Sequence, residues 1–126
     1  MPVTDVLVVD DEAVVRQGVS RILISHGYAV AEAADAQSAR SHPALGDCKL
    51  VLCDLMLPDE SGLVLLREIK ARRAELPVVM ITGYATPESL AQAEQAGVAG
   101  LLPKPFDEEE LITLVERVLG ARERDS

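Results

Sequence analysis

Four charged side chains in this 126-residue sequence each stand at the end of a short apolar run. They are Asp10, Asp11, Asp54 and Lys104. The runs before them, at 6–9, 50–53 and 98–102, have the length and composition of buried parallel strands. Because the carboxyl ends of parallel strands meet at one edge of a sheet, we expect the three carboxylates and the ammonium group to lie close together. Such a group of side chains can bind a divalent cation and a phosphoryl group. The fold does not require this grouping of charges, so it indicates a functional site.

The oxygen ligands of this predicted site favour Mg²⁺ over zinc or copper. Carboxylates that lie close together repel one another and shift each other's pKa unless a cation is present. A carboxylate can also attack phosphorus and become an aspartyl phosphate. Asp54 is the better candidate for that nucleophile because it stands alone on a central strand, whereas Asp10 and Asp11 look paired for metal binding. Thr82, which ends another apolar run, and Lys104 would hold the phosphate oxygens by a hydrogen bond and by charge.

Each of these residues has a simpler explanation when it is taken alone. An aspartate after a strand usually caps a helix or belongs to a turn, and a threonine at a strand end is routine. A single lysine there is usually a solvated surface charge. The joint arrangement at the strand ends, and not any one residue, therefore favours a functional site.

The pattern between these positions predicts an α/β fold in which helices cover both faces of a parallel sheet. The expected strands are 5–10, 28–33, 48–54, 77–82 and 98–102. The expected helices are 12–26, 35–43, 61–73, 86–96 and 107–121. The fourth helix has an apolar face of only Leu90, Ala93 and Ala96, so it buries little area and should be held most weakly.

Length and composition predict one domain without a surface for nucleic acid or membranes. We expect this domain over 1–121, followed at 122–126 by a frayed tail or the start of a linker. The formal net charge of −9 argues against binding of nucleic acid or an anionic membrane, since both require clusters of Lys and Arg. The chain has no signal pattern and no apolar run of about 20 residues, which predicts a cytoplasmic protein.

The two cysteines are expected to be small buried side chains. Cys48 and Cys53 belong to the same predicted strand, so they cannot easily face each other in a disulfide. A metal site built on them would need further ligands, and His26 and His42 show no supporting spacing.

Five short motifs, in order and at matching separations, resemble the receiver (response-regulator) domain of bacterial two-component signalling over nearly the whole chain. The motifs are Val8-Val9-Asp10-Asp11-Glu12, Asp54-Leu55-Met56-Leu57-Pro58 with Ser61-Gly62, Met80-Ile81-Thr82-Gly83, Ala96-Gly97-Val98-Ala99-Gly100, and Lys104-Pro105-Phe106. The resemblance implies a flavodoxin-like, doubly wound sheet of five parallel strands in the order 2-1-3-4-5.

The resemblance also implies the roles of the acidic residues. Asp54 would accept a phosphoryl group from the phosphohistidine of a sensor histidine kinase or a phosphotransfer protein. Asp10 and Asp11 would hold Mg²⁺ together with Asp54, and the backbone carbonyl of Met56 would be a further metal ligand.

On the phosphoryl side, the resemblance implies that Thr82 and Lys104 contact the transferred group and that the Lys104–Pro105 peptide is cis. Phosphorylation would change the surface made by the fourth helix, the fifth strand and the fifth helix. Through that surface the domain would control an effector domain or target protein, with homodimerisation as one form of output.

One position departs from common receiver sequences. Receivers of this kind commonly carry Tyr or Phe three residues before the lysine, and here that position is Leu101, which cannot form a phenolic hydrogen bond. We expect Thr82 still to turn toward the phosphoryl group, with more of the signal carried by the loop after Thr82 and by the weakly packed fourth helix. Met56 and Tyr84 occupy positions that line the entrance for hydrolytic water in similar domains. Unless they only pack on the surface, their apolar and bulky side chains predict slow self-dephosphorylation.

Two other functions fit this kind of sheet less well. A phosphatase that works through an aspartyl phosphate usually has an acidic residue two positions past the nucleophile, where this chain has Met56, and it needs a cap for substrate. A flavin- or nucleotide-binding module needs a Gly- or Ser/Thr-rich turn after the first strand, where Asp11 and Glu12 would repel phosphate. The sequence therefore favours a signalling switch over an enzyme, with at most slow self-catalysed phosphorylation and dephosphorylation.

Overall fold

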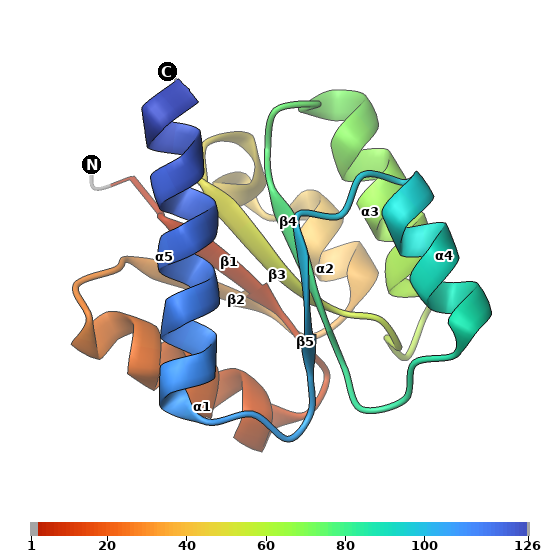
Figure 1. Ribbon diagram of the computed structural model, residues 1–126, viewed down its shortest axis with the longest axis horizontal. Helices are drawn as coiled ribbons and strands as arrows, with labels where there is room; N and C mark the ends of the chain where they lie inside the picture. The colour runs from red at the N-terminus through yellow and green to blue at the C-terminus, as the bar shows by residue number, and fades with distance from the viewer. Residues whose placement is uncertain (1–2, 126) are drawn as a thin grey trace.

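The computed structural model describes residues 3–125, and over this range it contains five strands, five α-helices and one short 3-10 helix (Figure 1). The strands are β1 (Val6–Val9), β2 (Val30–Ala33), β3 (Leu50–Asp54), β4 (Val78–Thr82) and β5 (Gly100–Pro103). The helices are α1 (Ala13–Ser25), α2 (Ala36–Ser41), the 3-10 helix η1 (Pro43–Gly46), α3 (Gly62–Arg72), α4 (Pro87–Gln95) and α5 (Glu108–Asp125).

All neighbouring strands are parallel, and their order is β2-β1-β3-β4-β5, which confirms the predicted doubly wound sheet. β1 and β3 pair in a register that places Val9 opposite Cys53, so the residues that follow them, Asp10 and Asp54, leave the sheet side by side. Thr82 at the end of β4 pairs with Pro103 of β5, directly before Lys104. The strand order therefore brings all four strand ends to one edge.

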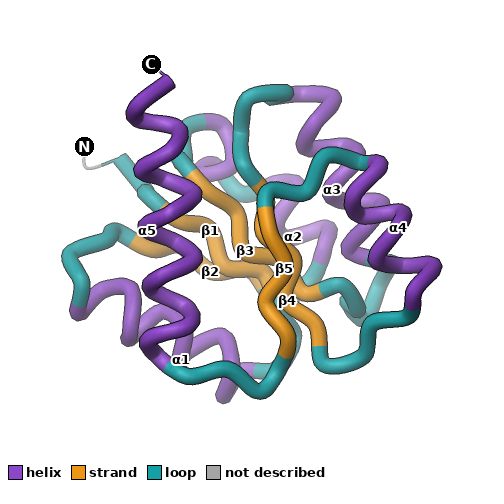
Figure 2. The backbone as a smooth tube through the Cα atoms, viewed as in Figure 1, coloured by secondary structure: helices purple, strands orange, loops and turns teal. Residues whose placement is uncertain are grey.

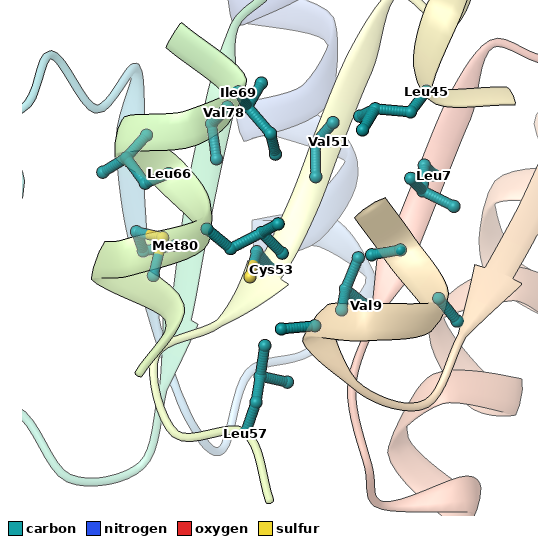
Figure 3. Close-up of a cluster of buried hydrophobic side chains, with 14 of the residues drawn as sticks. Leu7, Val9, Leu45, Val51, Cys53, Leu57, Leu66, Ile69, Val78 and Met80 are labelled. Atoms are coloured by element: carbon teal, nitrogen blue, oxygen red, sulfur yellow. The ribbon is translucent and has the colours of Figure 1, made fainter. Parts of the chain in front are cut away.

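Side chains that alternate along the strands form two separate hydrophobic clusters, one on each face of the sheet. On β3, Val51 and Cys53 face the cluster under α2 and α3, which Figure 3 shows with Leu66, Ile69 and Met80 around them. The other cluster packs strand residues under α1 and α5, which lie on the opposite side of the sheet (Figure 1). β1, β3 and β4 are buried along their whole length, so the strands that carry the site residues are fixed from both faces.

Two helices differ by more than one residue at one end from their predicted bounds. The helix expected at 35–43 ends at Ser41, because His42 precedes Pro43 and the residue before a proline is driven out of the α region; His42 has φ −70° and ψ 130°. The last helix runs to Asp125 and not to 121. The predicted domain boundary at 121 stays a prediction: the side chains from 121 on are not described, and Ser126 lies outside the described residues.

α4 buries little of its surface, as its sequence predicted. Ala93 is the buried residue between Pro87 and Gln95, while Leu90 is half-buried. The helix begins at a capping box in which the Ser89 N–H donates to the Thr86 side chain. Local capping, more than apolar burial, therefore holds this helix, and its low stability stays a prediction.

The two cysteines lie in the hydrophobic core on one face of the sheet. Cys48 and Cys53 are both free and buried, as predicted, and burial raises the pKa of both thiols. In the part of the chain that the structure describes, helices long and apolar enough for a bilayer are absent.

Gly62, the first residue of α3, lies against the end of β3. A Cβ atom placed on it would stand 2.3 Å from the backbone oxygen of Asp54 and 2.9 Å from the Met80 methyl group. Its N–H donates to the Leu55 carbonyl at 2.7 Å. Only glycine permits this approach, which places the start of α3 beside the carboxyl end of β3.

We expect Gly62→Ala to destabilise the domain by about 1–3 kcal/mol, because the backbone around Asp54 must move to make room for the methyl group. Gly18→Ala is the matched control: Gly18 lies inside α1 with open space around it, and alanine should stabilise the helix by about 0.5–1 kcal/mol. Urea unfolding of the two variants and the wild type measures both changes. Equal stability of the two variants would contradict the role assigned to Gly62.

Candidate functional site

The site lies where the loops leave the carboxyl ends of the strands, at the lower edge of the view in Figure 2, where the loops after β4 and β5 turn back. Asp10 follows β1 and is only 1% exposed, and its Oδ1 accepts the Glu12 N–H at 2.9 Å. This turn starts α1 and directs the Asp10 side chain into the edge of the sheet. Asp54 is the last residue of β3 and is 5% exposed. Its Oδ1 accepts the Met56 N–H at 2.9 Å.

Lys104 joins the carboxylates. Its Nζ donates to Asp54 Oδ2 at 2.9 Å and to Glu12 Oε1 at 3.1 Å, and it lies 3.1 Å from Asp10 Oδ2. Burial would lower the pKa of this ammonium group, but the contacts with the three carboxylates outweigh burial and raise its pKa above the usual value. Lys104 is therefore a permanent cation in the site. The Lys104 backbone N–H donates to the Thr82 carbonyl at 2.8 Å, and the Lys104–Pro105 peptide is cis, as predicted.

One oxygen of this cluster lacks a hydrogen bond. Asp10 Oδ2 is buried and has the Lys104 ion pair, but no donor in the described part of the chain meets hydrogen-bonding geometry with it. Burial raises the pKa of the Asp10 carboxyl, and the Glu12 N–H and Lys104 only partly offset that effect. A buried carboxylate that is short of partners is a suitable ligand for a hard cation.

The carboxylates that the structure groups together differ in part from those predicted. Asp10, Glu12 and Asp54 each offer an oxygen within 4.8 Å of the other two, a grouping that can hold a metal ion. Asp11 is exposed and is not in this group. Its role as a ligand stays a prediction. Glu12 was missed because three consecutive acidic residues do not reveal which side chains a turn directs inward.

Thr82 is buried at the end of β4, and its Oγ1 accepts the Tyr84 N–H at 3.0 Å. That bond uses the hydroxyl as an acceptor and leaves its proton free to donate. Within residues 3–125 the hydroxyl makes no hydrogen bond to Asp54 or Lys104, so the predicted contact with a phosphoryl group stays a prediction.

Comparison with known proteins decides the family. Residues 6–116 match the sequence model of the family described as the response regulator receiver domain. The chain belongs to this family. It is thus a receiver domain, as the motifs predicted. Its acidic cluster is formed by Asp10, Glu12 and Asp54, and Lys104 contacts all three carboxylates.

Several relatives and solved structures are similar to this receiver. It is 35% identical over 120 residues to the DNA-binding transcriptional regulator NtrC of Bradyrhizobium sp. (strain RP501 Parasponia), covering 95% of this chain and 25% of that protein. The receiver domain of NtrX from Brucella abortus has a TM-score of 0.84 at 40% identity, covering 92% of this chain and 98% of that one. A CheY-like receiver from Methanospirillum hungatei JF-1 has a TM-score of 0.90 at 27% identity, with 99% and 100% covered. This receiver therefore spans about a quarter of the length of the NtrC relatives.

Two residues beside the site, Met56 and Tyr84, are exposed. Met56 is 60% exposed and Tyr84 is 74% exposed. Both line a groove of about 490 Å³ between the loop after β3 and the start of α4. Leu101, at the position where similar domains carry an aromatic residue, is half-buried and packs against the cluster under α3.

Without divalent cations, we expect Asp10→Asn to make the receiver more stable at neutral pH. The folded-state pKa of Asp10 lies above its unfolded value of about 3.9, so the ionised form costs stability once the pH exceeds that value. The gain should be absent at about pH 3, where both states are protonated, and should grow as the pH rises through the folded pKa. Thermal unfolding in EDTA across this range measures the gain. A variant that is less stable than the wild type at every pH would contradict the conclusion that ionised Asp10 destabilises the folded receiver.

Proposed function

We propose that this receiver is a switch phosphorylated on Asp54 by a sensor histidine kinase or a phosphotransfer protein. The observation that carries the proposal is the contact between Asp54 Oδ2 and Lys104 Nζ, beside the buried Asp10 carboxylate. In the reaction, an Asp54 oxygen attacks phosphorus, the bond from phosphorus to the histidine nitrogen breaks, and the electron pair leaves on the imidazole. Lys104 Nζ lies 2.9 Å from Asp54 Oδ2, so its positive charge would stand next to the phosphoryl oxygens of the transferred group.

The acidic group supports Mg²⁺ as the cofactor. Asp10 and Asp54 would hold the ion together with the Met56 backbone carbonyl, joined by Asp11 as the family resemblance implies or by Glu12 as the structure groups it. When bound, Mg²⁺ supplies positive charge between the carboxylates and the incoming phosphoryl oxygens. The residues themselves position the acceptor: the Met56 N–H holds one oxygen of Asp54 and Lys104 holds the other.

The output belongs to the same proposal. The phosphoryl group would add charge next to Lys104 and Thr82 and bias an existing two-state equilibrium. Taking such an equilibrium from mostly off to mostly on requires about 5.5 kcal/mol of differential binding. Charge-assisted hydrogen bonds worth about 1.5–3 kcal/mol each can supply it. The face of α4, β5 and α5 is the proposed output surface, since α4 buries little apolar surface and is the next helix after Thr82.

The family, and not this structure, supports the partners and the location that we propose. Two relatives are the DNA-binding transcriptional regulator NtrC and the transcriptional regulatory protein FixJ, and this chain covers 25% and 54% of their lengths. We infer an effector domain or target protein as the output partner, homodimerisation through the α4–β5–α5 face as one form of output, and a cytoplasmic location. We also infer that the domain does not itself bind nucleic acid, which its net charge of −9 supports, and that it is a regulatory phosphoacceptor and not an enzyme.

Intact mass after incubation with acetyl phosphate and Mg²⁺ tests the acceptor. We expect one added phosphoryl group on the wild type, and none in EDTA or on Asp54→Asn, because the amide cannot act as the nucleophile. Asp35→Asn is the matched control: Asp35 lies at the start of α2 and should leave phosphorylation intact. Phosphorylation of Asp54→Asn at the wild-type level would refute Asp54 as the acceptor.

The exposed residues at the entrance predict a long-lived phosphorylated state. Met56→Asn and Tyr84→Ala should each shorten its half-life several-fold, because a polar side chain can orient water and a small one opens its path. Loss of the added mass after removal of the phosphodonor gives the half-life. A wild-type half-life of seconds that neither variant changes would count against this assignment.

A further inference from the structure

The loop that follows the acceptor, residues 55–61, is tied to the site along its inner side. The Met56 N–H donates to Asp54 Oδ1, and Met56 and Ser61 form an antiparallel bridge. The Leu55 N–H donates to the Ile81 carbonyl at 2.9 Å, which joins the loop to the end of β4. The same short segment therefore carries the N–H that holds Asp54 and the carbonyl proposed to bind Mg²⁺.

The same loop, residues 55–61, is also hydrogen-bonded to α2. Asp59 Oδ1 accepts the Ala36 N–H at 3.0 Å, and its Oδ2 accepts the Gln37 N–H at 3.0 Å. These hydrogen bonds, led by the one from Ala36, lower the pKa of Asp59, so its carboxylate is ionised at neutral pH. One residue further on, Glu60 pairs with Arg40 of α2. Two consecutive acidic residues thus link the acceptor loop to a neighbouring helix.

Arg40 extends this link to a third element. Its guanidinium also donates to both oxygens of Glu68 on α3, at 2.7 and 2.9 Å. The pair therefore links α2 directly to α3. Because α2 packs on the core through Ala36 and Ala39, the anchor of Asp59 is itself a rigid part of the fold.

From these contacts we infer that Asp59 is a positioning residue for phosphorylation. It holds the loop so that the Met56 N–H and carbonyl keep their places around Asp54, although Asp59 itself touches neither. Asp59 accepts the first two N–H groups of α2, and Asp35, directly before the helix, separately accepts the Ser38 N–H at 2.7 Å, so the helix keeps one cap when Asp59 is replaced. The inference rests on the proposed function, since it concerns the geometry of that reaction.

The structure provides a matched pair of variants. Asp59→Ala removes two hydrogen bonds at the start of α2 and the loop tether, whereas Asp35→Ala removes a cap from the same helix without touching the loop. Both variants should lower the unfolding temperature. Only Asp59→Ala should lower the rate constant of phosphorylation, by about tenfold at saturating Mg²⁺ and acetyl phosphate, because misplaced reacting groups slow transfer. Asp59→Asn, which keeps one acceptor oxygen, should recover part of that rate.

Amide hydrogen exchange gives a readout independent of the reaction. Asp59→Ala should speed exchange at Met56 and its neighbours at a temperature where both variants are folded, and Asp35→Ala should not. Equal phosphorylation rates and equal loop exchange in the two alanine variants would overturn the inference and leave the proposed function standing. A wild type that takes up no phosphoryl group under these conditions would overturn both.

Discussion

The site depends on one ammonium group surrounded by three carboxylates. Asp10 and Asp54 are almost completely buried at the edge of the sheet, where an uncompensated charge is costly. Lys104 provides a single positive charge for these two and for Glu12, so the cluster keeps a net negative charge after Lys104 is counted. The burial that raises the pKa of Asp10 is the same effect that makes a divalent cation favourable there. Burial of the carboxylates and the charge of Lys104 together therefore set the electrostatics of this cluster.

The parallel sheet makes this cluster possible. β1 and β3 lie next to each other although about 40 residues separate them in the chain, and their register brings Asp10 and Asp54 together. β4 and β5 then place Thr82 and Lys104 on the same edge. Two hydrophobic clusters pack on the two faces of the sheet, and Figure 3 shows one of them, so the strands that lead to this edge are held in place by the core.

Rigidity is unevenly distributed around this edge. The loop after Asp54 is tied to β4, to α3 and, through Asp59, to α2. The segment after Thr82 leads instead to α4, which buries little apolar surface. The segment after Asp54 is thus held by more contacts to neighbouring elements than the segment after Thr82. This asymmetry gives a physical reason to place the proposed output on the α4 side.

The sequence by itself determined the fold class, the strand order through the family motifs, and the strand-end positions of Asp10, Asp54, Thr82 and Lys104. It could do so because apolar periodicity and the carboxyl-end rule depend only on local pattern and parallel connectivity. The tertiary structure alone decided that Glu12 lies in the acidic group and that Asp59 ties the acceptor loop to α2. Turn geometry and contacts between distant segments direct these side chains, and residue type and spacing carry no record of either. The small apolar face of α4 could be read from its sequence because it depends on residue types within one helix. Only the packed structure showed that the Met56 N–H and Lys104 contact Asp54, because these contacts depend on a turn and on a distant segment.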